Sequence, residues 1–153
     1  GEDIKFIARR IMICASEDVS NADPMALVVA TSAAQAVERI GMPEARIILS
    51  QAALYVATAP KSNACYMAID KALDVVKNSK TAPVPVHLQD AHYKGSAKLG
   101  HGVGYLYAHD YPNHYVRQQY LPDAYVNEKF YEPGDMGYER DIKKHLDKIK
   151  SEA

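Results

Sequence analysis

The chain has 153 residues, a formal net charge of -1, 48% apolar and 24% charged residues, which fits one globular domain of ordinary size. So small a net charge gives no overall attraction to nucleic acid or to an anionic membrane. No apolar run reaches the roughly 20 residues of a membrane span, so we expect no membrane partner. Cys14 and Cys65 form neither a CxxC motif nor a disulfide framework, which favours a reducing, cytoplasmic compartment.

The start of the chain is unusual, because Gly1 is not preceded by a methionine and helical periodicity begins almost at once. We therefore expect the chain to be a piece of a longer protein, whose chemistry can lie outside these residues.

Two helices are expected first. Asp3 is a suitable N-cap for a helix that ends near Ser16, with apolar residues at helical spacing. Asp23 followed by Pro24 begins a second helix that runs to about Ile40 and ends at Gly41.

The third helix is expected at Pro43–Ala59 and is unusually apolar. Its apolar residues occupy most of the helix circumference, and so do those of the second helix, whereas a surface helix keeps one apolar stripe. Burying the apolar surface of two such helices requires more packing partners than a chain of 153 residues easily supplies. This apolar surplus predicts that the chain associates with another protein surface.

A fourth helix is expected from Ser62 to about Asn78, joined to the third by a short connection. Four helices with short loops and many alanines predict a closely packed helical bundle over about 3–79. The fold class predicted is therefore all-α.

The composition changes after Ser79. The segment TAPVPV (Thr81–Val86) cannot be helical, and most tyrosines, histidines and glycines follow it. We expect residues of about 80–137 to form an irregular wrap around the bundle, with short helical turns near 88–99 and 113–120. A terminal helix is expected at about 138–151. The three parts are expected to form a single domain.

Motifs that would carry catalysis are missing from the sequence. There is no P-loop, and GHGVGY (Gly100–Tyr105) follows no predicted strand. The histidines match no metal-ligand spacing, and no nucleophile has a recognisable partner. We expect no catalytic, cofactor-binding or metal-binding residue here, although a metal-dependent enzyme that uses the histidines stays an alternative.

Single-stranded nucleic-acid binding is a second alternative, because tyrosines and basic residues alternate in the irregular part. Such mixtures can stack bases and neutralise phosphates. The candidate contacts are Lys94, Lys98, Arg117, Tyr115 and Tyr120.

Several long stretches resemble one known family. SEDVSNADP (Ser16–Pro24), QAVERIGMPEARIILSQAALYVATAPKSNACYMAID (Gln35–Asp70), PVHLQDAHYKGSAKLGHGVGYLYAHDYPNHYVRQQYLP (Pro85–Pro122) and YEPGDMGYE (Tyr131–Glu139) are similar to the C-terminal region of RarA/MgsA-type AAA+ ATPases. The eukaryotic members of that family include the Werner-helicase-interacting protein. The resemblance covers essentially the whole chain.

The resemblance implies a helical oligomerisation domain similar to a clamp-loader collar. It implies that this region assembles the parent ATPase into a homotetramer for replication-fork maintenance and recombination. ATP, magnesium and the catalytic residues would belong to an N-terminal ATPase module absent from this chain. DNA, reached through the parent, and single-strand-binding protein are the other partners implied, with a nucleoid-associated location in the cytoplasm.

We predict that the self-association surface lies on the second and third helices, where the apolar surplus is greatest. The candidate residues are Leu27, Val28, Ile47, Ile48, Leu54 and Tyr55.

Overall fold

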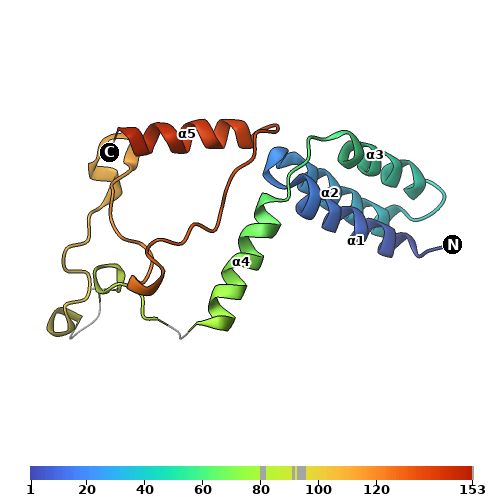
Figure 1. Cartoon of the computed structure of the whole chain (residues 1–153). Coiled ribbons are helices and arrows are strands. Elements are labelled where there is room, and N and C mark those ends of the chain that lie inside the picture. Colours follow the sequence, from blue (N-terminus) through green and yellow to red (C-terminus); the bar gives the residue numbers. More distant parts are fainter. Residues whose placement is uncertain (80–81, 91, 93–95, 153) are drawn as a thin grey trace. The chain divides into compact units, whose positions relative to one another are not determined.

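The structure is a computed structural model that describes residues 1–79, 82–90, 92 and 96–152. Over these residues it contains helices and turns but no strand, which confirms the all-α class (Figure 1). The likeness to a clamp-loader collar stays a prediction.

The first three helices begin and end where local signals place them. In α1 (Ile4–Cys14), the Asp3 carboxylate accepts the backbone N–H of Lys5 at 2.8 Å. In α2 (Met25–Ile40), Asp23 accepts the N–H of Met25 at 3.1 Å, and Gly41 ends the helix with φ 73°. The third helix, α3, spans Ala45–Thr58. The predicted caps are confirmed, and each helix is slightly shorter than expected.

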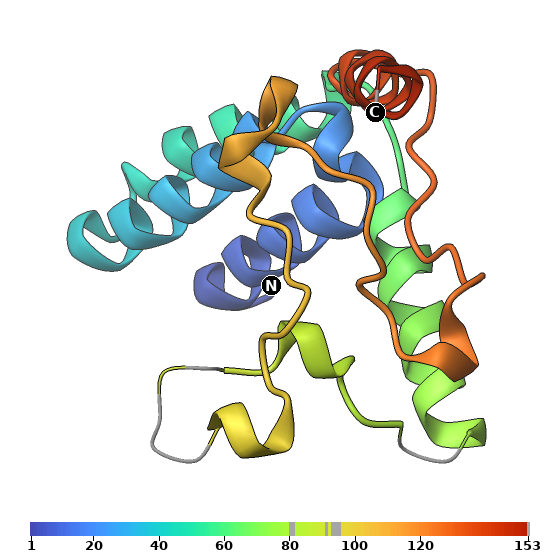
Figure 2. The same ribbon diagram turned by 90° about the vertical axis from the view of Figure 1, so that its left-hand side faces the viewer.

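Helix α2 packs against both α1 and α3, so the three helices form one compact group (Figures 1 and 2). Each helix buries a single narrow stripe. On α2 the buried residues are Ala26, Ala30, Ala33 and Val37, at helical spacing. Small side chains at these positions allow the helix axes to approach closely. The expectation that α2 and α3 are covered on nearly all sides is therefore not met within one chain.

Between α1 and α2 the chain turns through a π-helical turn (Ala15–Val19) and a 3₁₀ turn (Ser20–Ala22). Ser20 has φ 54°, which directs the chain back toward α2. We call residues 15–22 the elbow.

Helix α4 spans Ala64–Asn78, and the Ser62 hydroxyl oxygen just before it accepts the N–H of Ala64 at 3.1 Å, as the sequence predicts. Helix α5 spans Glu139–Ser151. The chain divides into two compact units, Gly1–Leu73 with Phe130–Lys144, and Asp74–Lys129 with His145–Ala153. Helices α4 and α5 each continue from one unit into the other.

The second unit is irregular and built from 3₁₀ turns, as the composition predicts. These turns are Val86–Leu88, Ser96–Leu99, Ala108–Asp110, Pro112–His114 and Asp123–Tyr125. Within this unit the end of α5 is held by two contacts: Arg117 Nη2 donates to the carbonyl of Lys150 at 3.0 Å, and Asn113 Nδ2 donates to Glu152 at 2.6 Å.

Candidate self-association surfaces

The first compact unit, Gly1–Leu73 with Phe130–Lys144, is called the helical unit, and it has small side chains inside and many large apolar side chains outside. Its fully buried apolar residues are alanines and three valines, whereas the large apolar residues on α1 to α4 are either half-buried or, in many cases, more than one-third exposed. Exposed apolar side chains mark interaction surfaces where they gather into contiguous patches. The arrangement is typical of a protein whose large side chains are buried against another molecule.

One apolar hollow lies between α2 and α3, and we call it the α2–α3 groove. It has a volume of about 320 Å³ and is lined by small apolar residues with two neutral polar side chains. Val28 and Ile48, both candidates from the sequence, lie in it together. The lining contains no charged residue, which is the composition of an interface centre. The lining residues are Val28, Val29, Ser32, Ala33, Ala36, Ile48, Gln51 and Ala52.

The outer side of α3 carries two further candidates. Ile47 and Leu54 are 59% and 62% exposed, and they lie opposite the buried stripe of that helix. Tyr55 behaves differently, because it is half-buried against the core and its hydroxyl donates to Asp23 at 2.8 Å. That hydrogen bond raises the pKa of Tyr55 above its ordinary value. The role of Tyr55 in self-association stays a prediction.

A second apolar hollow, the α1–α2–α4 groove, has a volume of about 560 Å³. Leu27, another candidate from the sequence, lies in it, so Leu27 and Val28 belong to two different grooves. Tyr66 and Ile69 of α4 also line it, and sequence reasoning did not select them. Glu17 is the one charged residue of the lining. The complete lining is Met12, Ile13, Ser16, Glu17, Leu27, Cys65, Tyr66 and Ile69.

Glu139 fixes the start of α5 to the start of α4. Its side chain is fully buried and accepts three hydrogen bonds, from Ser62 Oγ at 2.6 Å, the Gly134 N–H at 2.8 Å and the Tyr131 hydroxyl at 3.1 Å. Burial raises the pKa of Tyr131, which keeps its hydroxyl protonated as a donor. We call these four residues the Glu139 clasp. No local pattern distinguishes Glu139 from the other acids of this charged helix.

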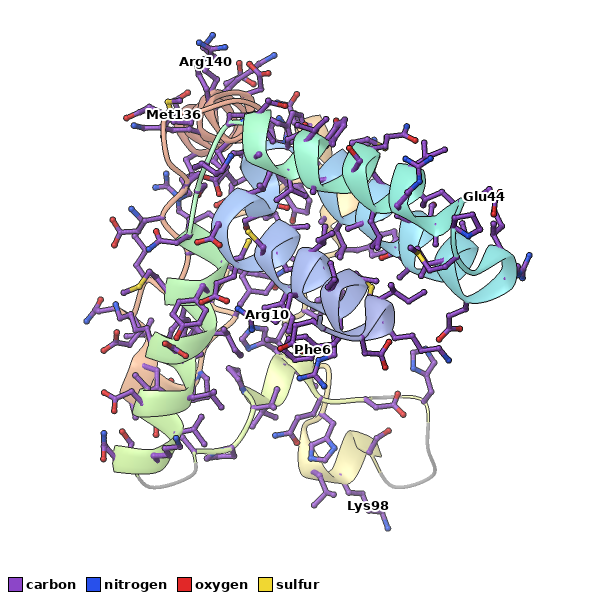
Figure 3. The ribbon with its side chains drawn as sticks, turned by 90° about the vertical axis from the view of Figure 1, so that its right-hand side faces the viewer. Phe6, Arg10, Glu44, Lys98, Met136 and Arg140 are labelled. Carbon is purple, nitrogen blue, oxygen red and sulfur yellow. The ribbon has the colours of Figure 1, made fainter. Side chains whose placement is uncertain are left out.

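Beside the clasp the chain makes close backbone contact with the elbow. The N–H of Tyr138 donates to the carbonyl of Ala22 at 2.8 Å, and Gly137 has φ 54°. A Cβ at Gly137 would overlap the carbonyl oxygen of Ala22, so only glycine fits. Met136 and Arg140, in contrast, project outward near the start of α5 (Figure 3). The YEPGDMGYE stretch therefore has a structural role in the helical unit.

The candidate nucleic-acid contacts do not form one group. Tyr115 and Arg117 line a hollow of about 310 Å³ beside Ile149, and the Arg117 guanidinium is bonded to the end of α5. Lys98 and Tyr120 are exposed but do not line this hollow. Lys94 lies outside the described residues.

In the described ranges of the chain, no group of three or more His, Cys, Asp or Glu side chains could hold a metal ion. His109 and His114 form a pair, with 3.3 Å between their Nδ1 atoms. No helix in the same ranges is long and apolar enough to cross a membrane. Both cysteines are free thiols, and burial raises the pKa of Cys14.

Comparison with known proteins gives a consistent result over the whole chain. The sequence profile described as "MgsA AAA+ ATPase C terminal" matches residues 1–150. Replication-associated recombination protein A of Bacillus subtilis is 45% identical over 148 residues, which are 96% of this chain and 35% of that protein. An AAA domain-containing protein of Mycobacterium tuberculosis is 50% identical over 151 residues, 99% of this chain and 33% of that protein. The ATPase WRNIP1 of Dictyostelium discoideum is 40% identical over 128 residues, which are 83% of this chain and 15% of that protein.

Proposed function

The chain belongs to the family of MgsA-type AAA+ ATPase C-terminal regions, and on this premise we propose that it is the part through which such an ATPase assembles with itself. It spans about one-third of the length of the bacterial relatives it matches. The assembly proposed is a homotetramer, with the ATPase modules carried by the remaining part of each subunit.

The inverted distribution of side-chain size supports this proposal. Large apolar residues lie outside an alanine core on three adjacent helices, and the α2–α3 groove has no charged lining residue. Burying each such side chain is worth about 1.5–3 kcal/mol. Four of them would contribute on the order of 6–12 kcal/mol, of which association entropy removes a part.

The relatives are named replication-associated recombination proteins and ATPases, which suggests the activity of the whole protein. We propose that the parent protein binds ATP and magnesium in its ATPase module, acts on DNA at replication forks and works in the cytoplasm near single-strand-binding protein. In that scheme this chain holds the subunits together and performs no chemistry itself.

The mass of the purified chain in solution tests the proposal. Size exclusion with light scattering at two loadings and two salt concentrations should give the mass of four chains, with little effect of salt because the contacts are apolar. A monomer at every loading would overturn the proposal.

Charged substitutions locate the surface. The double variant Ile47→Glu with Leu54→Glu should stay helical by circular dichroism but form a smaller assembly, because a buried unpaired carboxylate is costly. Ala53→Glu is the matched control, since Ala53 is exposed on a different side of α3. Equal masses for the wild type and the double variant would remove these two residues from the interface.

A further inference from the structure

Helix α4 is the least covered helix of the structure. None of its 15 residues is buried, although it carries several large apolar side chains. A helix of this length is marginal in water without packing on one face. Something must therefore cover α4 for it to be stable.

The exposed apolar residues of α4 form one continuous line, which we call the α4 stripe. Tyr66, Ile69, Leu73 and Val76 are 44%, 55%, 45% and 70% exposed. Their successive spacings of three, four and three residues are those of the seam between two packed helices. The spacing is the same in both directions along the helix, so the stripe can match a second copy of itself in antiparallel orientation.

The half-buried residues Cys65, Ala68, Ala72 and Val75 of α4 lie on another side of the helix from the stripe. The Lys71 ammonium lies 5.9 Å from the centre of the Phe130 ring, and Lys71 is about 180° around the helix from the stripe. Asn21 Nδ2 donates to Cys65 Sγ at 3.3 Å beside the first turn. The stripe therefore stays open, and its first half borders the α1–α2–α4 groove through Tyr66 and Ile69.

We propose that two copies of this chain pair through their α4 helices in antiparallel orientation. Aligning Tyr66 with Val76 of the second copy also aligns Ile69 with its Leu73. The second half of each α4 then lies along the α1–α2–α4 groove of the other copy, where its apolar side chains fill the hollow. The contact is symmetric, so both grooves are filled.

Charge supports a second copy as the occupant. Glu17 is the one charged residue of the groove lining. In the antiparallel alignment, Lys77 of the second copy reaches the level of Cys65 and Tyr66, beside Glu17.

This inference rests on the proposed function and adds a second, distinct surface to it. The α2–α3 groove and the outer side of α3 would form one contact, and α4 the other. A tetramer with two kinds of symmetric contact is a dimer of dimers. Loss of either contact should therefore stop assembly at two chains.

Disulfide cross-linking tests the orientation directly. In chains with Cys14 and Cys65 replaced by alanine, Ile69→Cys and Leu73→Cys are refolded together and oxidised by air. The antiparallel pair should give a cross-linked dimer from the mixture at least several-fold above that from either variant alone. Met67→Cys, on another side of α4, is the control and should not cross-link with either. Absence of the mixed dimer, or cross-linking of each variant with itself, overturns the proposal.

Light scattering then separates the two proposals. Ile69→Glu with Leu73→Glu should halve the mass, Ile47→Glu with Leu54→Glu should also halve it, and all four together should give monomers. An α4 variant with the wild-type mass overturns the α4 contact and leaves self-association intact. A monomeric wild type overturns the proposed function itself. If circular dichroism shows that the α4 variant is unfolded, the cross-linking result decides.

Discussion

At the scale of single residues, Glu139 is fully buried and accepts three hydrogen bonds from the residues around it. Replacing it with alanine leaves the half-buried Ser62 hydroxyl and Gly134 N–H without their acceptor. We expect Glu139→Ala to lower the free energy of unfolding by about 3 kcal/mol, measured by urea denaturation. Glu139→Gln should cost clearly less, because one oxygen can still accept both bonds. Equal losses for the two variants would show that the packing of the side chain, and not its hydrogen bonds, matters.

Gly137 is constrained by space as well as by φ. A methyl group there would meet the carbonyl oxygen of Ala22, and φ 54° is unfavourable for any other residue. We expect Gly137→Ala to cost about 3 kcal/mol or more in the same denaturation experiment. Gly104→Ala is the control, because Gly104 also has positive φ but nothing lies within 4 Å of its Cβ position. A cost no greater than the control would mean that the elbow can move away.

At the scale of elements, the buried alanines of α2 determine how closely α1 and α3 pack against α2. Ala30 is 1% exposed, so a larger side chain must push the helices apart. We expect Ala30→Leu to destabilise the chain by about 1–3 kcal/mol, although leucine is a good helix former. Ala53→Leu, at an exposed position of α3, should change stability by less than about 0.5 kcal/mol. Urea denaturation of both variants is the measurement, and a neutral Ala30→Leu would show spare volume in the core.

Local signals were sufficient to predict the helices but not the surfaces between them. Asp3, Asp23, Gly41 and Ser62 act on neighbouring residues, so their capping roles were predictable. The α4 stripe was missed because α4 has apolar residues on several sides, and only the fold shows which of them stay open. The clasp was missed because Glu139 and Ser62 are 77 residues apart in the sequence. The six candidates on α2 and α3 were chosen by composition, which cannot show that Leu27 lies in one groove, that Val28 and Ile48 lie in another, and that the rest lie in neither.

At the scale of the whole molecule, the small core and the exposed apolar surface have one consequence for stability. A core of alanines and valines buries little apolar area per residue, so the isolated chain should be of low stability. Association stabilises the native state by mass action, because the unfolded chain does not assemble. The stability of the folded chain should therefore depend on its concentration.

The Tm measured by differential scanning calorimetry should rise with protein concentration, by several degrees over a hundred-fold range. In a domain of this size, each 1 kcal/mol of added stability raises the Tm by about 2–4 °C. The variant with glutamate at positions 47, 54, 69 and 73 should unfold at a lower Tm that no longer depends on concentration. A Tm independent of concentration in the wild type would mean that the apolar surface contributes nothing to its stability, and that the exposed residues must be explained by contacts with the rest of the parent protein.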